Sequence, residues 1–145
     1  MSTFYSNPYR RNRGNVVTLS AAATLDAGDS GTTYILDAAA GAAISLPALP
    51  TDGNELEFTF IVGAAFATSD WVVSSSEGDN INGIISDMGS TVAGVPAAGE
   101  DNITFELGAE TIGDWVRFVS DSGNSQWLVS GACSANGGIT ANDPA

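Results

Sequence analysis

Short runs of β-branched and aromatic residues recur from residue 16 to residue 129, and each is bounded by Gly, Pro, Asp, Asn or Ser. Runs of this length with turn-forming residues between them are typical of strands joined by tight turns. The clearest is residues 56–62, in which Leu56, Phe58 and Phe60 alternate with Glu57 and Thr59. This alternation places apolar side chains on one face of a strand and polar ones on the other. We find no convincing amphipathic helix, so the sequence predicts an all-β fold.

The 145 residues suffice for one domain with a single core. We predict a single-domain β-sandwich or jelly-roll-like barrel with an extended N-terminal arm. The expected organisation is an arm at residues 1–15, a β-domain at 16–131 and a Gly/Ala-rich C-terminal tail at 132–145. The predicted core residues are Leu36, Leu46, Phe58, Phe60, Val62, Trp71, Val73, Phe105, Val116, Phe118 and Leu128.

Strands are expected at residues 16–19, 32–36, 43–46, 56–62, 71–74, 81–85, 102–107, 115–119 and 126–129. Asn82-Gly83 is a turn-forming dipeptide and is expected to interrupt the run at 81–85. Residues 86–101 are expected to form a long loop with one weak strand, and residues 121–124 a hairpin turn.

Charge is distributed unevenly along the chain. The net charge is −13, yet three of the four basic residues, Arg10, Arg11 and Arg13, lie within the first thirteen positions. Residues 14–145 therefore carry +1 − 17 = −16. A body this negative repels nucleic acid and anionic membranes, so neither is an expected partner. No apolar run approaches the ~20 residues needed to span a bilayer, and the N-terminus lacks the apolar stretch of a secretory signal, so we expect synthesis in a cytoplasm.

The first fifteen residues show no strand periodicity but are rich in residues that anchor interfaces. A disordered terminus is the alternative interpretation. Three aromatics within nine positions favour a binding arm, because solvated tails are poor in aromatic residues. The residues expected to carry this binding are Phe4, Tyr5, Tyr9, Arg10, Arg11 and Arg13.

The residue types needed for most enzyme chemistry are missing. Histidine is absent, which excludes a Ser/His/Asp or Cys/His triad, and lysine is absent, which excludes a Walker-type phosphate loop. The single cysteine, Cys133, leaves too few soft ligands for zinc. A carboxylate pair could in principle hydrolyse glycosides, but a chain this short offers no expected deep cleft. We therefore expect no enzyme, no catalytic residue, no cofactor and no metal site.

The acidic turns and the tryptophans each allow a further functional interpretation. Acidic turns can bind calcium, but none of the clusters here has the full set of oxygen ligands, and Asp, Asn and Gly form turns without metal. The clusters are Asp26/Asp29, Asp52/Asn54, Glu77/Asp79/Asn80 and Asp121/Asn124. The tryptophans at 71, 115 and 127 could form a sugar-stacking platform or pack against protein. Because two of them lie in runs that are apolar on both faces, we predict a possible oligomer interface at Trp115, Arg117 and Trp127.

Five segments in order carry a resemblance over residues 17–131. They are LDAGDSGTTYILD at 25–37, GAAISLP at 41–47, LEFTFIV at 56–62, GDNING at 78–83 and IGDWVRFVSDSGNSQWLVSG at 112–131. This series resembles a β-rich module of tailed-bacteriophage structural proteins, both capsid decoration (cement) proteins and head or tail fibres. The closing strand, Ser-Asp-x-Gly-Asn turn and Trp-containing strand form its most distinctive part.

The resemblance implies a virion structural protein, commonly trimeric, without catalytic residues. The chain has no coiled-coil heptads and adds only a basic, aromatic arm, which favours a decoration protein over a fibre appendage. The implied partners are the major capsid protein and further copies of this chain, and the implied location is the outer capsid surface. The alternative is a head- or tail-fibre or adhesin module that holds host-surface glycans through its tryptophans or residues 86–101.

Overall fold

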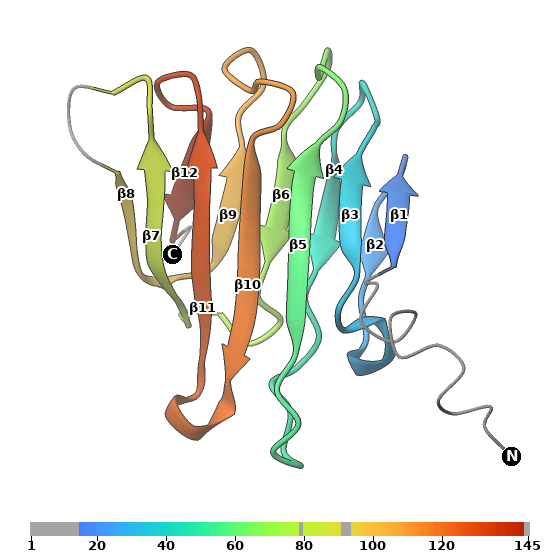
Figure 1. The fold of residues 1–145 in the computed structure, drawn as a ribbon, viewed down its shortest axis with the longest axis vertical. Coiled ribbons are helices and arrows are strands. Elements are labelled where there is room, and N and C mark those ends of the chain that lie inside the picture. The colour runs from blue at the N-terminus through green and yellow to red at the C-terminus, as the bar shows by residue number, and fades with distance from the viewer. Residues whose placement is uncertain (1–14, 79, 91–93, 144–145) are drawn as a thin grey trace, which may run out of the picture.

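The computed structural model describes residues 15–78, 80–90 and 94–143. Nearly all of the regular structure is β, and two sheets pack face to face around one core (Figure 1). The all-β sandwich predicted from the sequence is confirmed. The six predicted arm residues all lie outside the described residues. Within the described part of the chain, no helix has the length and apolar character that crossing a bilayer requires.

Seven strands form one sheet and five form the other. The larger sheet has the order β1 (Val16–Leu19), β3 (Thr33–Leu36), β5 (Glu57–Val62), β10 (Trp115–Asp121), β11 (Gln126–Cys133), β7 (Ile81–Asp87), β8 (Val95–Glu100). The smaller has the order β12 (Ile139–Asn142), β9 (Asn102–Phe105), β6 (Trp71–Ser74), β4 (Ala42–Ser45), β2 (Ala23–Thr24). Two short 3₁₀ helices, η2 (Ala27–Asp29) and η3 (Ser122–Asn124), lie in turns.

The first six strands alternate between the two sheets, and within each sheet they pair in parallel with one another. In the larger sheet β1 pairs with β3 and β3 with β5, and in the smaller sheet β2 pairs with β4 and β4 with β6. This part of the chain therefore winds as a flattened coil. The later strands add mostly antiparallel pairs, including the hairpin of β10 and β11 that the sequence predicts around η3.

Aromatic side chains fill the middle of the sandwich. Phe118 lies edge-on to Phe60 and to Trp127, with ring centroids 5.9 Å and 6.5 Å away. All but one of the predicted core residues are buried. The exception is Leu128, which is 43% exposed because its neighbours Trp127 and Val129 occupy the inner side of β11.

The dipeptide Asn82-Gly83 lies inside strand β7, so the turn predicted there is wrong. Gly83 pairs with Val129 of β11, and a Cβ atom at Gly83 would lie 1.9 Å from the Val129 carbonyl oxygen. Glycine is needed at this position for close approach of two backbones. The Asn82 amide ties β7 to its neighbours: Gly99 N–H donates to its Oδ1 at 2.9 Å, and its Nδ2 donates to Gln126 Oε1 at 3.1 Å.

Two strands are absent from the sequence-based prediction. The first, β2, has only two residues, too few for a periodic pattern. The second, β12, lies in the segment expected to be a tail. Its residue Ile139 is fully buried, and β12 pairs along its whole length with β9. The sandwich thus reaches at least to Asn142.

A carboxylate holds the start of β5 to the end of β10. Glu55 accepts hydrogen bonds from the hydroxyls of Ser120 and Ser122, and Ser120 Oγ also accepts from the Leu56 backbone N–H at 2.7 Å. These hydrogen bonds, that from Ser120 first, lower the pKa of the Glu55 carboxyl below its ordinary value of 4.5. Because the charged form is favoured in the folded state, this contribution to stability is complete above the ordinary pKa and is lost as pH falls through the lowered one.

Acidification should therefore destabilise the wild type more than a Glu55→Gln variant. We expect the Tm of the wild type to fall more steeply from about pH 5 to about pH 3, because Gln does not titrate. Glu100→Gln removes the same charge from β8 and serves as the control for the change in net charge. Parallel curves of Tm against pH for the wild type and Glu55→Gln would contradict the assignment.

Candidate interaction surface

The outward side of the five-stranded sheet is polar and satisfies its own hydrogen bonds. Asn142 Nδ2 donates to Thr104 Oγ1 at 3.2 Å and to Thr140 Oγ1 at 3.0 Å, and Thr104 donates to Asn102 Oδ1 at 3.1 Å. Ser45 and Ser74 continue this row of short polar side chains across β4 and β6. Such a surface is well suited to water.

The outward side of the seven-stranded sheet, here called the outer face, differs sharply. Its residues alternate with the buried residues of the same strands. They are Thr33 and Ile35 of β3; Glu57, Thr59 and Ile61 of β5; Trp115, Arg117, Val119 and Asp121 of β10; Gln126, Leu128, Ser130 and Ala132 of β11; and Asn82, Ile84 and Ser86 of β7.

Strand register brings the apolar residues of the outer face together. Ile35 pairs with Ile61, Ile61 with Trp115, and Trp115 with Ala132, which makes one apolar row across four strands. Leu128 pairs with Val119 lower on the same face. Trp115 is 37% exposed and Leu128 is 43% exposed. A solvent-facing sheet surface usually alternates to polar residues, so this face is unusually apolar.

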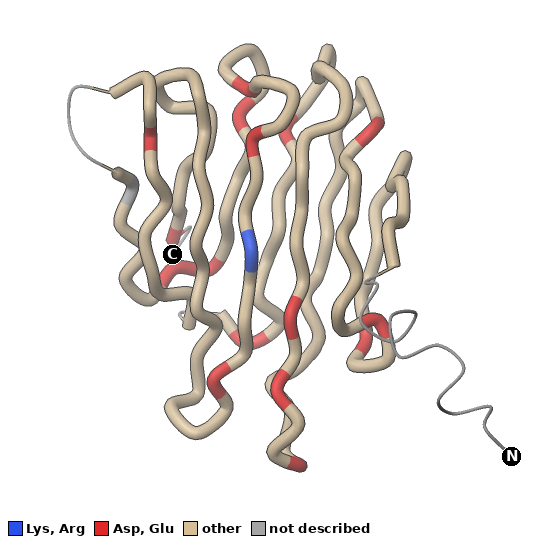
Figure 2. The backbone as a smooth tube through the Cα atoms, in the orientation of Figure 1, with Lys and Arg blue, Asp and Glu red and all other residues tan. Residues whose placement is uncertain are grey.

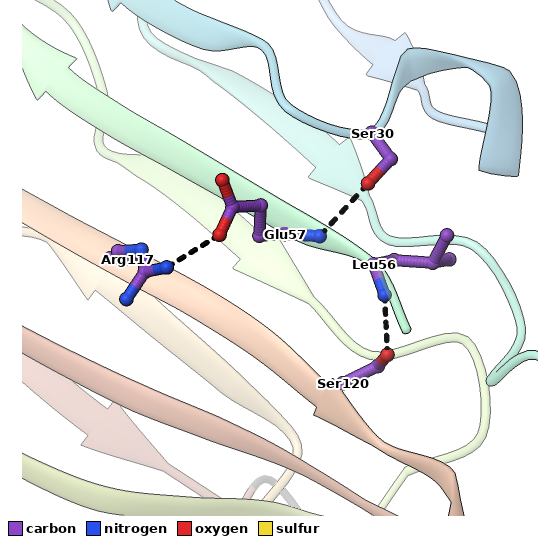
Figure 3. Close-up of polar contacts among 5 residues, drawn as sticks. All are labelled: Ser30, Leu56, Glu57, Arg117 and Ser120. Atoms are coloured by element: carbon purple, nitrogen blue, oxygen red, sulfur yellow. Dashed lines mark hydrogen bonds and ion pairs between the residues drawn. The ribbon is translucent and has the colours of Figure 1, made fainter. Parts of the chain in front are cut away.

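The outer face carries little net charge although the protein is strongly acidic. Arg117, the only basic residue among those described, forms an ion pair with Glu57 across β10 and β5 at 2.5 Å (Figure 3). The two side chains are 47% and 51% exposed, so the pair contributes only about 0–1 kcal/mol. Most other acidic residues lie in turns and at strand ends, away from the middle of the sheet (Figure 2).

Two open depressions flank Met88 just after β7. One, of about 270 Å³, is lined by Ile112, Trp115 and Cys133 among others, and the second, of about 240 Å³, by Ile84 and Ser86 among others. Met88 is 75% exposed and Ile112 is 68% exposed. The depressions therefore extend the apolar surface beyond the end of the sheet.

Beside the first depression, the Asp114 carboxylate is hydrogen-bonded and the Cys133 thiol is buried. Asp114 is buried, and its carboxylate accepts from Thr111 N–H at 2.9 Å and from both the N–H and the hydroxyl of Ser134 at 3.0 Å. Cys133 is 1% exposed, and burial raises the pKa of its thiol, which keeps it in the unreactive protonated form. These side chains hold the loop ends together.

Two of the three predicted interface residues lie on the outer face, and the third lies in the core. Trp115 and Arg117 lie side by side with the apolar rows on the outer face. Trp127 is fully buried, packed 6.1 Å from Phe58 between ring centroids, and offers no surface to a partner. Of the three tryptophans considered for a sugar-stacking platform, Trp71 is also fully buried.

Sequence reasoning missed several outer-face residues. Ile61 breaks the apolar–polar alternation of β5, which is the signal that could have identified it. Leu128 was assigned to the core because its run is apolar on both faces, and the inner side cannot be chosen from such a run alone. Ile84 was hidden by the turn expected at residues 82–83.

The acidic turns use their oxygens to hold the backbone. Asp26 caps η2 by accepting from Gly28 N–H at 2.7 Å, and Asp52 accepts from Asn54 N–H at 3.0 Å. Asp121 accepts from the side-chain amides of Asn124 and Gln126, which lowers the pKa of its carboxyl. In the remaining cluster, Glu77/Asp79/Asn80, Asp79 lies outside the described residues. Across the described ranges, no three Asp, Glu or Cys side chains gather in a way that would hold a metal ion.

Comparison of the chain with protein-family models, with curated proteins and with solved structures gives no match in any of the three. The class of the protein is therefore taken from the structure itself. It is an all-β sandwich with one polar and one more apolar outward side.

Proposed function

We propose that this protein is a structural component of a tailed-bacteriophage virion: a capsid decoration protein that binds the outer surface of an assembled head and stabilises it. The observation that carries the proposal is the division of the chain into two binding elements. One is a sandwich with an apolar outer face, and the other is a preceding segment with three arginines and three aromatics. The resemblance to phage structural modules supplies the biological setting.

The two elements divide the work between them. In this proposal copies associate as trimers, and the arm of each copy contacts neighbouring major capsid proteins. Exposed ion pairs contribute about 0–1 kcal/mol each, so three arginines alone do not anchor a monomer. Burial of Phe4, Tyr5 and Tyr9 would add about 1.5–3 kcal/mol apiece. Joining copies makes several arms act together and raises avidity by orders of magnitude.

The start of the described chain fits this division. Asn15 lies beside β3, whose Thr33 N–H donates to its carbonyl oxygen at 2.7 Å, and it leads directly into the edge strand β1. The described chain therefore begins at an edge of the larger sheet, away from β10 and β11.

The alternative, a fibre or adhesin module that binds host glycans, gains less support. A stacking platform needs exposed aromatic faces. Trp71 and Trp127 are buried, which leaves Trp115 alone among the three tryptophans. We therefore retain decoration as the proposed function.

Deletion of residues 2–13 should abolish most binding to capsids. The experiment incubates purified heads that lack their decoration layer with full-length or truncated protein and measures occupancy on sedimented particles. We expect occupancy to require at least about tenfold more truncated protein, because the anchoring aromatics are gone. Replacing Arg10, Arg11 and Arg13 with Gln should weaken binding less than replacing Phe4, Tyr5 and Tyr9 with Ser. Undiminished occupancy by the truncated protein would overturn the role of the arm.

A further inference from the structure

We infer that the outer face of the seven-stranded sheet is the surface through which copies of this chain join one another. The inference deepens the proposed function, since it names the surface and the partner behind the cooperation between arms. It is argued from the face itself and is tested without capsids, so its failure and the failure of capsid binding can be told apart.

The first argument is the contrast between the two outward sides of the sandwich. Over β9 and β12 the five-stranded sheet presents Thr and Asn side chains that hydrogen-bond to one another. The seven-stranded sheet presents Trp115, Leu128 and Ile84, which are 37%, 43% and 59% exposed. Trp115 and Leu128 lie on either side of a row that contains Arg117 and Ser130. Several large apolar side chains exposed on one face are a usual mark of an interaction site.

The second argument is charge, and it favours a second copy as the occupant. Two copies of a chain with a net charge of −13 repel each other wherever their acidic loops meet. On the outer face the Glu57 carboxylate is paired with Arg117. The other acid on this side, Asp121, lies at the end of β10 and accepts hydrogen bonds from Gln126 and Asn124, so copies can approach over the middle of the face without an unpaired acid in the contact. The same lack of net charge gives no attraction to a highly charged partner such as a nucleic acid or an anionic lipid surface.

The third argument is area. The seven strands contain 42 residues, each of which covers about 3.3 Å along its strand and about 4.8 Å across the sheet. The face therefore offers about 670 Å² per copy for contact with neighbouring copies. Each partner in a specific protein interface contributes about 600–1,000 Å², so the face is large enough.

The Arg117–Glu57 pair gives the contact a means of recognition. It lies on β10 and β5, near the middle of the sheet, where a partner would exclude water. A charge pair shut off from water must stay paired, within one copy or between copies, or the contact is penalised. The pair within each copy meets this requirement, and a partner surface with its own Arg117 and Glu57 could in addition form pairs between copies.

The test is sedimentation equilibrium of the full chain with a matched pair of variants. Leu128→Glu places a charge on the outer face, whereas Leu107→Glu makes the same change at a site 40% exposed on the loop after β9. We expect the wild type and Leu107→Glu to associate equally, and Leu128→Glu to associate at least about a hundredfold more weakly. Retained cooperative thermal unfolding shows that each variant is folded.

A charge exchange provides the second measurement. Arg117→Glu puts two acids side by side on the face and should weaken association at least about tenfold, while the double variant Arg117→Glu, Glu57→Arg should recover most of the loss. A wild type that stays monomeric at high micromolar concentration would overturn the inference. Equal weakening by Leu128→Glu and Leu107→Glu, or full association of folded Leu128→Glu, would overturn it as well.

Discussion

Replacing Phe118 with alanine should lower the free energy of unfolding by about 3–5 kcal/mol, as expected when a fully buried aromatic ring is removed. Phe118 lies at the centre of the aromatic core and contacts Phe60 on one side and Trp127 on the other. Both neighbours belong to rigid strands of the larger sheet, so the cavity cannot close easily. Domains of this size have total stabilities of about 5–15 kcal/mol, so this loss is a large fraction of the whole.

Urea unfolding followed by tryptophan fluorescence measures the effect. Val119→Ala provides the control, because Val119 is the next residue on β10 but points to the outer face and is only partly buried. It should cost about 1 kcal/mol or less. The packing assignment fails if Phe118→Ala is as stable as Val119→Ala.

The second large effect is expected from Gly83→Ala. The new methyl group would lie 1.9 Å from the Val129 carbonyl oxygen and 2.9 Å from its carbon, and the backbone φ of +147° is itself unfavourable for alanine. Relief requires β7 to move away from β11, which breaks a parallel ladder seven residues long. We expect a loss of about 3 kcal/mol or more, with the amides of β7 and β8 losing protection from hydrogen exchange first.

Gly53→Ala separates the steric effect from backbone strain. Gly53 has a φ of +79° but nothing lies within 4 Å of the position its Cβ would take. Alanine there should cost only about 1 kcal/mol, the usual cost of a left-handed residue other than glycine. Equal losses at positions 53 and 83 would show that the approach of β7 to β11 is looser than described.

Strand positions were predictable because a strand with one buried face leaves a two-residue period in the sequence. Residues 56–60 show it plainly and begin a central strand, β5. The topology was not predictable in this way, since the period is the same in parallel and antiparallel pairs. Nothing local in residues 16–19 or 33–36 states that β1 pairs with β3 in parallel after the chain has visited the other sheet.

The exposed residues of the outer face were predictable only in part. The run at residues 115–119 is apolar on both sides, which predicts that some of its apolar residues face outward, and Trp115 does so. Trp127 was placed with Trp115 and Arg117 because a run such as residues 126–129 does not state which alternate set faces the core. Packing decides that point: Trp127 fills the space between Phe58 and Phe118, and Leu128 turns outward as a result.

The most direct test of the proposed function is to image virions with and without this protein. We predict low-resolution density on the outside of the head that disappears when the protein is removed and returns when purified protein is added back. Head shells without it should also rupture more readily under osmotic shock. Density that changes only on the tail or its fibres, or a particle unchanged by removal of the protein, would contradict the assignment as a capsid decoration protein.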